Sequence, residues 1–348
     1  MDNPLIIGQP LSRPKVLFLG NGIIRAFGDG ARGCGDLEKL IYKVSGVESP
    51  SGINSPTIPF PMRIAASFVN SDPCHDRIKT AVSDLMGMKN KETDTLLCNH
   101  KVADLPLFQR LIKAGFTDII TTNYGYEIEK ALWKRSPSSG NMRPDFYRNY
   151  SYPKKFGIME YKYKIWKHYR FRDSGPRIWH IHGEYLKPQS IVFEYSDYCS
   201  FLAKVKDYPK PNSSEKSGID SHGEKGNLET NWIKAFHWGD VYILGFGAGI
   251  GEPVFWWLMQ RKMRRNNPSG KVIFYEPSFA SEGDNSRNRI QQQKDILAMM
   301  EAFGAEHRDM GVIITKDSQF KEFYKKACED IIAEVKGSAN PCEASERK

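Results

Sequence analysis

Short apolar segments alternate with helical patterns along this chain, and this alternation limits the folds that the chain can adopt. Residues 15–20, 117–122 and 240–245 are rich in β-branched and aromatic residues, as buried strands are. Residues 36–44 and 253–264 carry apolar side chains at helical spacing. Helices that follow strands in this order favour parallel strand pairing. The sequence therefore predicts an α/β fold with a Rossmann-like, doubly wound, mostly parallel sheet and helices on both faces.

The alternation continues along the rest of the chain. Further helices are expected over 78–88, 105–114, 127–133, 196–205, 228–236, 287–303 and 319–335, and further strands over 178–182, 271–275 and 312–315. Residues 135–153 and 207–227 are rich in Pro, Gly, Ser and charged residues, so we expect surface loops there.

Composition excludes several classes of protein. The chain has no run of about 18 uncharged apolar residues and no basic segment leading into an apolar one at its N-terminus, so we expect a cytoplasmic protein without a membrane partner. Its six cysteines form no Cys-x-x-Cys, which argues against a disulfide framework or a tetrathiolate zinc site, and no metal is expected. The net charge of +9 is compatible with nucleotides, nucleic acid or an acidic partner and selects none of them.

Two glycine turns follow predicted strands. Gly20 and Gly22 would let backbone N–H groups approach a pyrophosphate, because a Cβ atom at either position would stand in the way. Arg25 could pair with a phosphate or lie on a solvated helix face. The second turn runs from Gly245 to Gly249. Two such turns suit a dinucleotide better than one, although a tight turn without a ligand remains the alternative for each.

Polar side chains end two other strands. Asn123 and His182 would reach the same edge of a parallel sheet, where an amide and an imidazole can hold a ribose and move a proton. The alternative for His182 is a strand-end histidine without chemistry. His180 should share its face, as a helper or as a core residue. Glu276 ends a further strand, where an acid can accept adenosine ribose hydroxyls.

These segments resemble the motifs of the sirtuin-like proteins. The segment Leu19-Gly-Asn-Gly-Ile-Ile-Arg25 is similar to their first glycine turn, Thr121-Thr-Asn-Tyr124 to their asparagine motif, and His182-Gly183 to their histidine–glycine motif. Leu244-Gly-Phe-Gly247 falls where the family has a later glycine turn. The resemblance implies that NAD+ is the substrate and is cleaved between nicotinamide and ribose. Asn123 would then position water and ribose, and His182 would be the general base. The expected nucleotide-binding residues are Gly20, Asn21, Gly22, Arg25, Thr122, Gly245, Phe246, Gly247 and Glu276.

The chain also departs from the family pattern. Protein deacylases of the family hold a structural zinc with two close cysteine pairs, and this chain has no such pairs, which disfavours lysine deacylation. Related NAD+ hydrolases often carry Asp directly after the asparagine motif, where this chain has Gly125. That role is then unfilled or passes to Glu127 or Glu129. Asn21 stands where many relatives have a small residue.

The resemblance implies a function and partners. Stand-alone sirtuin-like chains without the zinc module are commonly NAD+-depleting effectors of prokaryotic anti-phage (abortive infection) systems. We therefore expect a homo-oligomer or a complex with a separate sensor, of Argonaute type, HerA ATPase type or KongMing type. A deacylase or ADP-ribosyltransferase, and a nucleotide-sensing module without catalysis, are the alternatives. One sirtuin-like domain is expected over 1–336, with a helical insertion at about 60–115, variable insertions at 135–175 and 207–227, and a disordered tail over 337–348.

Three other segments could be mistaken for sites. Residues 154–172 interleave bases with aromatics, a pattern compatible with a solvated helix face, a partner contact or, least favoured, direct nucleic-acid binding. Cys74-His75 and Cys98-Asn-His100 lack a second pair at metal-ligand spacing, so burial is the better interpretation of these residues.

Overall fold

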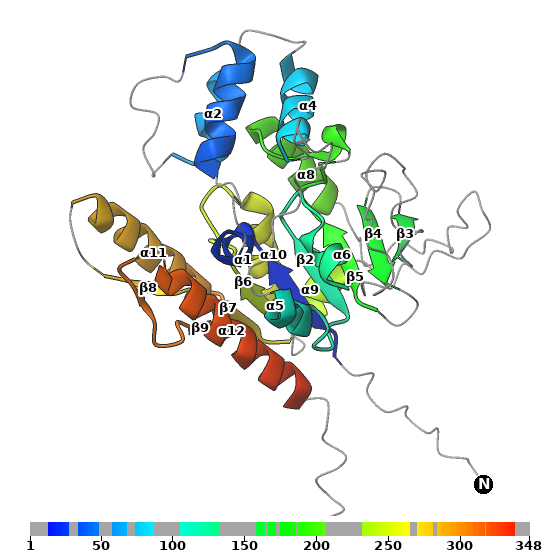
Figure 1. Ribbon diagram of the computed structural model, residues 1–348, viewed down its shortest axis with the longest axis vertical. Coiled ribbons are helices and arrows are strands. Elements are labelled where there is room, and N and C mark those ends of the chain that lie inside the picture. The colour runs from blue at the N-terminus through cyan, green and yellow to red at the C-terminus, as the bar shows by residue number, and fades with distance from the viewer. Residues whose placement is uncertain are drawn as a thin grey trace, which may run out of the picture.

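The computed structural model describes residues 13–27, 34–48, 58–67, 74–86, 105–132, 158–163, 166–171, 175–185, 187–206, 232–264, 270–280, 284–316 and 318–337. Its centre is an eight-stranded sheet (Figure 1) with the order β3-β4-β5-β2-β1-β6-β7-β9. The strands are β1 (Lys15–Leu19), β2 (Asp118–Thr121), β3 (Ile158–Tyr163), β4 (Trp166–Phe171), β5 (Arg177–His180), β6 (Asp240–Leu244), β7 (Val272–Tyr275) and β9 (Ala305–Arg308). The six strands from β5 to β9 are parallel, which confirms the predicted fold class.

Helices surround this sheet. They are α1 (Asn21–Phe27), α2 (Cys34–Ser45), α3 (Phe60–Arg63), α4 (Cys74–Met86), α5 (Leu105–Ile112), α6 (Glu127–Leu132), α8 (Tyr195–Lys206), α9 (Trp232–Trp238), α10 (Pro253–Met263), α11 (Asp284–Ala302) and α12 (Ser318–Gly337), with short 3-10 turns at Ala65–Ser67 and Pro188–Ser190. None of the described helices is both long and apolar enough to cross a membrane.

The strand order creates a switch point beside β1. The chain passes from β1 to β2 and β5 on one side, and then returns to β6 on the other side of β1. In open α/β sheets, ligands bind outside the carboxyl ends of the strands at such a point. The two glycine turns, which follow β1 and β6, therefore meet where a ligand site is expected.

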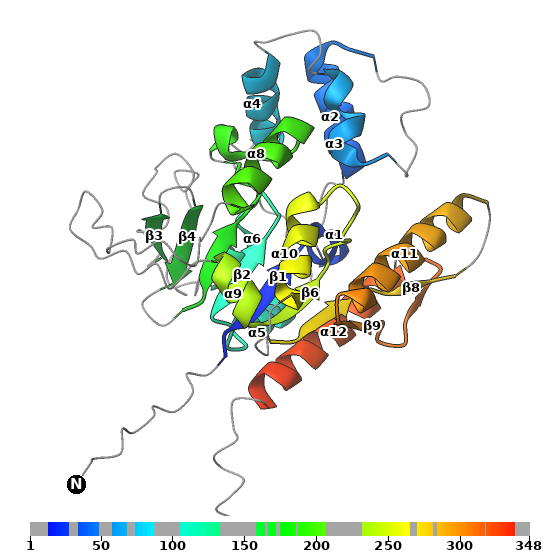
Figure 2. The ribbon, with the colours of Figure 1, turned by 180° about the vertical axis from the view of Figure 1, so that it is seen from behind.

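Alternating side chains divide the core into two faces. Leu17 and Leu19 of β1 pack with residues of α5, α6 and α12, whereas Val16 and Phe18 pack with residues of α8, α9 and α10. Helices α5 and α12 lie in front of the sheet in Figure 1, and α9 and α10 lie in front of it in Figure 2. Burial on both faces explains why the strands are almost entirely apolar.

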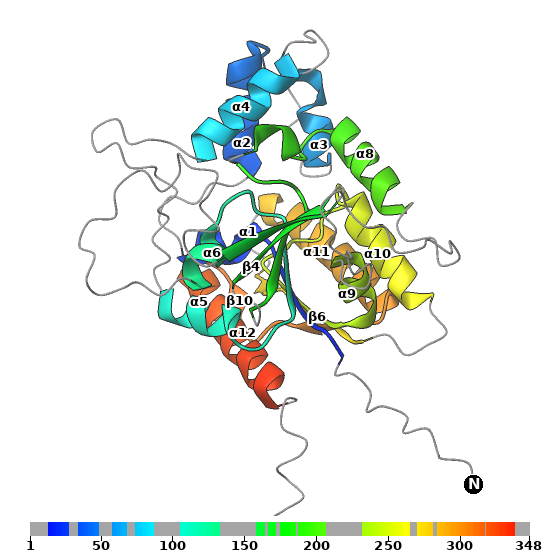
Figure 3. The same ribbon diagram turned by 90° about the vertical axis from the view of Figure 1, so that its right-hand side faces the viewer.

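A third apolar cluster lies over the carboxyl end of the sheet. Residues of α2 and α4 pack there against Ile191 and Phe193, which follow β5 in the chain. Figure 3 shows α2, α3, α4 and α8 together on this side of the strands. Helix α5 also belongs to the helical insertion expected at 60–115, but it does not join this group. Its apolar residues pack in the core on the face of the sheet that α12 covers.

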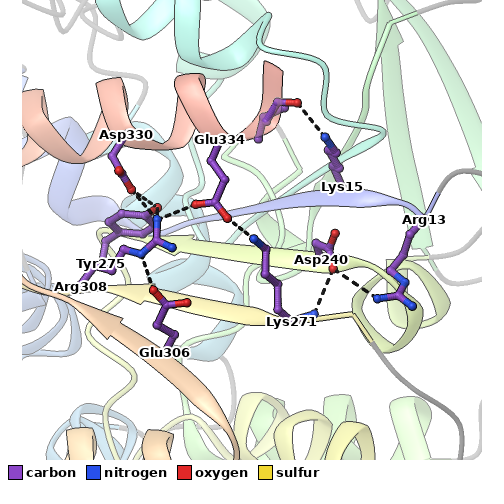
Figure 4. A network of polar contacts seen from close by, with 10 residues as sticks. Arg13, Lys15, Asp240, Lys271, Tyr275, Glu306, Arg308, Asp330 and Glu334 are labelled. Atoms are coloured by element: carbon purple, nitrogen blue, oxygen red, sulfur yellow. Dashed lines mark hydrogen bonds and ion pairs between the residues drawn. The ribbon is translucent and has the colours of Figure 1, made fainter. Parts of the chain in front are cut away.

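Helix α12 is fixed to the sheet by a polar network (Figure 4). Arg308 donates hydrogen bonds to Asp330 (2.7 Å) and Glu334 (2.5 Å), and Lys271 also contacts Glu334. Lys15 of β1 donates to the carbonyl oxygen of Val335 (2.7 Å). These contacts join the C-terminal helix to strands β1, β7 and β9.

The structure corrects two predictions of secondary structure. The predicted strand at 312–315 does not enter the main sheet: β10 (Ile313–Ile314) pairs with β8 (Ser278–Phe279), and the edge position belongs to β9. The β9 sequence, Ala-Glu-His-Arg, is polar because an edge strand is partly solvated, and so it carries no apolar signal.

The basic and aromatic segment at 154–172 is also not a helix in its described part. Strands β3 and β4 form an antiparallel pair that extends the sheet beyond β5. Alternation of basic and aromatic residues has the period of a strand, which favours this outcome. The predicted loops 135–153 and 207–227, residues 228–231 of the helix predicted at 228–236, the tail beyond 337 and Cys98-Asn-His100 lie outside the described residues.

Candidate active site

The two glycine turns pack directly against each other. The N–H of Gly20 donates to the carbonyl oxygen of Leu244 (3.0 Å), and the N–H of Gly22 donates to that of Gly245 (2.8 Å). A Cβ atom on Gly20 would overlap with the backbone of Gly245 and Phe246, and Gly245 itself has a φ of +70°. Close backbone packing thus requires both glycines. Contact of this turn with a nucleotide stays a prediction, and these two N–H groups are already hydrogen-bonded within the protein.

A second group of predicted residues lies around the hydroxyl of Tyr324 on α12. A Cβ atom on Gly22 would overlap with this hydroxyl. Burial and the Glu276 carboxylate raise the pKa of Tyr324, and the Arg25 guanidinium acts in the opposite direction. Exposed Arg25 and partly buried Glu276 therefore both lie within electrostatic reach of the Tyr324 hydroxyl. Glu276 also accepts a hydrogen bond from Gln293 (3.5 Å).

The asparagine motif is fixed to the first glycine turn. The side-chain amide of Asn123 donates to the carbonyl oxygen of Gly20 (3.3 Å). Its main-chain N–H donates to the Thr121 hydroxyl (3.1 Å), which in turn donates to the carbonyl oxygen of Leu19 (3.0 Å). Asn123 therefore lies at the carboxyl end of β2, half-buried and directly beside the turn after β1.

The histidine–glycine motif forms a tight turn after β5. Gly183 has a φ of +87°, and a Cβ atom there would overlap with the carbonyl of Ser190. This turn directs the buried imidazole of His182 against the rings of Tyr198 and Phe201. Its Nε2 lies 3.4 Å from a carboxyl oxygen of Glu252, the residue before α10.

His182, Thr122, Phe246 and Glu252 line one crevice between the carboxyl edge of the sheet and α10. The crevice has no space wide enough for a water molecule. Phe246 forms part of its wall through packing with Phe18 (4.8 Å between ring centroids) and Phe255 (4.9 Å). Among the other residues predicted to bind nucleotide, Asn21 is half-buried and Gly247 is exposed.

Burial controls the protonation of this pair. It lowers the pKa of His182 to about 3. It raises the pKa of Glu252 to about 8, against the effect of a hydrogen bond from the Tyr198 hydroxyl (3.2 Å). At neutral pH the carboxyl group is therefore protonated and the imidazole is neutral, and the low pKa makes His182 a weak proton acceptor until Glu252 ionises.

Sequence reasoning missed Glu252 and Tyr198. A carboxylate directly after a glycine-rich turn and before a helix was a usable signal for Glu252, because that position faces the carboxyl edge of the sheet. No sequence signal indicates Tyr198, because the position of α8 next to His182 depends on tertiary packing.

His180 does not share a face with His182, contrary to the sequence prediction. Strand β5 ends at His180, and the turn that follows breaks the two-residue alternation. The His180 ring instead lies against Tyr126 (5.4 Å between ring centroids), on the side of α6. Its Nδ1 is 3.0 Å from the carbonyl oxygen of Asn123, and its Nε2 is 2.8 Å from Glu129. Burial opposes the charge, but Glu129 and Glu184 raise the pKa of His180 to about 9.

Glu127 occupies the space beside Gly125. A Cβ atom on Gly125 would overlap with both carboxyl oxygens of Glu127, whose side chain is almost fully buried. Of the two acids considered for the missing aspartate, Glu127 therefore places its carboxylate where a side chain at position 125 would begin. Glu129 is paired with His180.

A larger hollow of about 440 Å³ adjoins the histidine–glycine turn. Among the described residues, its walls include His180, Gly183 and Glu184 but neither Asn123 nor His182. Its lysines are largely neutralised: Lys79 pairs with Asp197 (2.8 Å) and Lys187 with Glu184 (2.8 Å). We therefore assign the chemistry to the smaller crevice, where the imidazole lies.

Within the described residues, no group of three or more His, Cys, Asp or Glu side chains could hold a metal ion. The cysteines that can be placed, Cys199 and Cys328, are free thiols, one exposed and one buried.

Comparison with known proteins gives a family match over part of the chain. Residues 117–215 match the family model of the SIR2-like domain, which spans both Asn123 and His182. The match supports a place in the sirtuin-like family, whose SIR2-like domains use NAD+. No curated protein matches the chain.

Proposed function

We propose that this chain is an NAD+ glycohydrolase that cleaves the bond between nicotinamide and ribose. The observation that carries the proposal is the crevice at the switch point of the sheet, which Thr122 and the neutral imidazole of His182 both line. Asn123 is fixed beside it on the first glycine turn. The match to the SIR2-like domain over 117–215 supports NAD+ as the ligand.

The proposed reaction needs few groups. Nicotinamide leaves as a neutral molecule, so no acid is required, and charge develops on the ribose. Water then adds to the ribose carbon, and His182 accepts its proton, giving nicotinamide, ADP-ribose and a proton that is released to solvent. Positioned proton transfer of this kind contributes about 10²- to 10⁴-fold in rate. Glu252 orients the imidazole and, once deprotonated, stabilises the imidazolium.

The narrow crevice supports a regulated enzyme. Small-molecule sites typically enclose roughly 300–1,000 Å³, whereas this crevice has no space wide enough even for a water molecule. Entry of a nicotinamide riboside group therefore requires its walls, which include α10, to separate. We propose that a partner or a nucleotide or nucleic-acid sensor drives this opening. The chain would then be the NAD+-depleting effector of an anti-phage system, as a homo-oligomer or with an Argonaute-type, HerA-type or KongMing-type protein.

The cellular test measures NAD+ in cells that express the chain with its genomic neighbours under phage challenge. We expect NAD+ to fall with the native chain and to stay level with Asn123→Ala or His182→Ala. Lys336→Ala, an exposed position at the end of α12, is the matched control and should behave as the native chain does.

Three outcomes would favour the alternative functions. Stable NAD+ in every condition, with binding by the purified protein, would identify a nucleotide-sensing module. Nicotinamide release that depends on an acyl-lysine peptide would identify a deacylase, and release that labels a protein would identify an ADP-ribosyltransferase.

A further inference from the structure

The two ring nitrogens of His180 both face oxygen atoms. Nδ1 lies 3.0 Å from the carbonyl oxygen of Asn123, and Nε2 lies 2.8 Å from Oε1 of Glu129. A carbonyl oxygen accepts hydrogen bonds and cannot donate, and the same holds for an ionised carboxylate. With Glu129 ionised, both nitrogens must carry hydrogen for both contacts to form, which makes the ring an imidazolium.

The surroundings of His180 compensate this buried charge. The side chains of His180 and Glu129 are 3% and 1% exposed, so solvent screens their attraction very little. A second carboxylate, Glu184, belongs to the same cluster, where it accepts a hydrogen bond from the Tyr126 hydroxyl (2.5 Å) and pairs with Lys187 (2.8 Å). The charged and titratable groups that the described contacts place around the ring include Glu129 of α6, Tyr126 directly before α6, and Glu184 and Lys187 after β5.

The contact with Asn123 has a clear structural consequence. Two groups hold the main chain of Asn123: the imidazolium at its carbonyl oxygen, and the Thr121 hydroxyl at its N–H. With the main chain fixed on both sides, the side-chain amide is directed to Gly20 at the first glycine turn. Loss of the contact at the carbonyl oxygen would free the segment that carries the amide.

We propose that His180 is a positioning residue, a buried imidazolium which, held by Glu129, fixes the Asn123 loop in the geometry needed for NAD+ cleavage. The role in cleavage rests on the proposed function. The protonation state and the control of the Asn123 loop rest on the contacts alone and can be measured without turnover.

Two substitutions separate charge from geometry. In Glu129→Gln, the side-chain amide can donate to Nε2 of a neutral His180 while Nδ1–H still donates to Asn123, so the loop is held without the positive charge. In His180→Gln the contact with Asn123 is lost and Glu129 is left buried without its cationic partner. The double variant His180→Gln/Glu129→Gln removes that unpaired charge and separates loss of folding from loss of positioning.

The direct test is ¹⁵N NMR of the histidine rings in the native chain. The protein has eight histidines, so the His180 signals can be identified by their absence in the double variant. We expect both His180 nitrogens to be protonated at pH 7.5 in the native chain, and one to be protonated in Glu129→Gln. The amide signals of residues 121–125 should shift in the double variant. A neutral His180 ring at pH 7.5 in the native chain, or unshifted loop signals, would overturn the proposal.

Activity gives a second readout. If the chain cleaves NAD+, kcat of the double variant should fall about 10²-fold, the loss expected for a misplaced reacting group. The native rate should decline as the pH rises through about 9, where His180 loses its proton, and this decline should be absent in Glu129→Gln. A chain without NAD+ cleavage but with the expected NMR result would contradict the proposed function and leave the positioning role intact.

Discussion

The Nε2 atom of His182 lies 3.4 Å from a carboxyl oxygen of Glu252, and both groups lie in a crevice at the switch point of the sheet. Two distant segments create this pair: the turn after β5 supplies the imidazole, and the glycine-rich turn after β6 supplies the carboxyl group. Burial favours the neutral form of each group. The low pKa makes the imidazole a weak base, and ionisation of Glu252 would strengthen it, because a carboxylate beside the ring stabilises the imidazolium.

Glu252→Gln should change the pH dependence of NAD+ cleavage. Only the ionised carboxylate stabilises the imidazolium, so the native rate should rise with pH through about 8, the raised pKa of Glu252. The glutamine variant cannot ionise and should show a lower rate without this rise. Initial rates between pH 6 and pH 9.5 test this. A rise that persists in the variant would assign the ionisation to another group. Glu301→Gln, at an exposed position on α11, is the control.

Gly20→Ala should destabilise the fold. The added methyl group would overlap with backbone atoms of the second glycine turn, and backbone cannot move aside as a flexible side chain can. Overpacking of this kind costs about 1–3 kcal/mol in the free energy of unfolding. Gly247→Ala lies in the second turn where an added Cβ atom meets nothing, so it should change stability by less than about 0.5 kcal/mol. Urea unfolding of both variants distinguishes them, and equal stability would contradict the close packing of the turns.

Asp118→Ala should be more damaging. Asp118 is fully buried and accepts two hydrogen bonds from Arg177 (2.7 Å each) and one from the Trp179 indole (2.9 Å), which join β2 to β5. Removal of one partner of a buried ion pair costs about 3–5 kcal/mol, because the remaining charge stays uncompensated. Thermal unfolding beside Glu301→Ala measures the loss. A change below about 1 kcal/mol would show that the pair is solvated in solution.

Moving the carboxylate from position 127 to position 125 tests the role of Glu127. Gly125→Asp alone should lower NAD+ cleavage, because two carboxylates would compete for one buried space and repel each other. The double variant Gly125→Asp/Glu127→Gly returns a single carboxylate to that space and should recover much of the rate. Steady-state kinetics of both variants provide the comparison. A double variant as impaired as the single one would show that Glu127 does not substitute for an aspartate at position 125.

The sequence predicted the fold class because its central strands are buried on both faces and carry continuous apolar residues. It also located Thr122, Asn123 and His182 at the carboxyl edge. It could not show that the turns at Gly20 and Gly245 pack against each other, because contacts between turns depend on strand order. It predicted His180 and His182 on one face because the strand was expected to continue to His182. No residue pattern indicates that β5 ends at His180. Edge strand β9 escaped prediction because it is polar.

The central claim is that this site hydrolyses NAD+, and the most direct measurement is the release of nicotinamide and ADP-ribose by the purified chain together with its co-expressed neighbours. We predict equal amounts of both products, loss of NAD+ in proportion, and a rate reduced about 10²- to 10⁴-fold in His182→Ala with a comparable loss in Asn123→Ala. Intact NAD+ after prolonged incubation of the activated complex, or an unchanged rate in His182→Ala, would contradict the account.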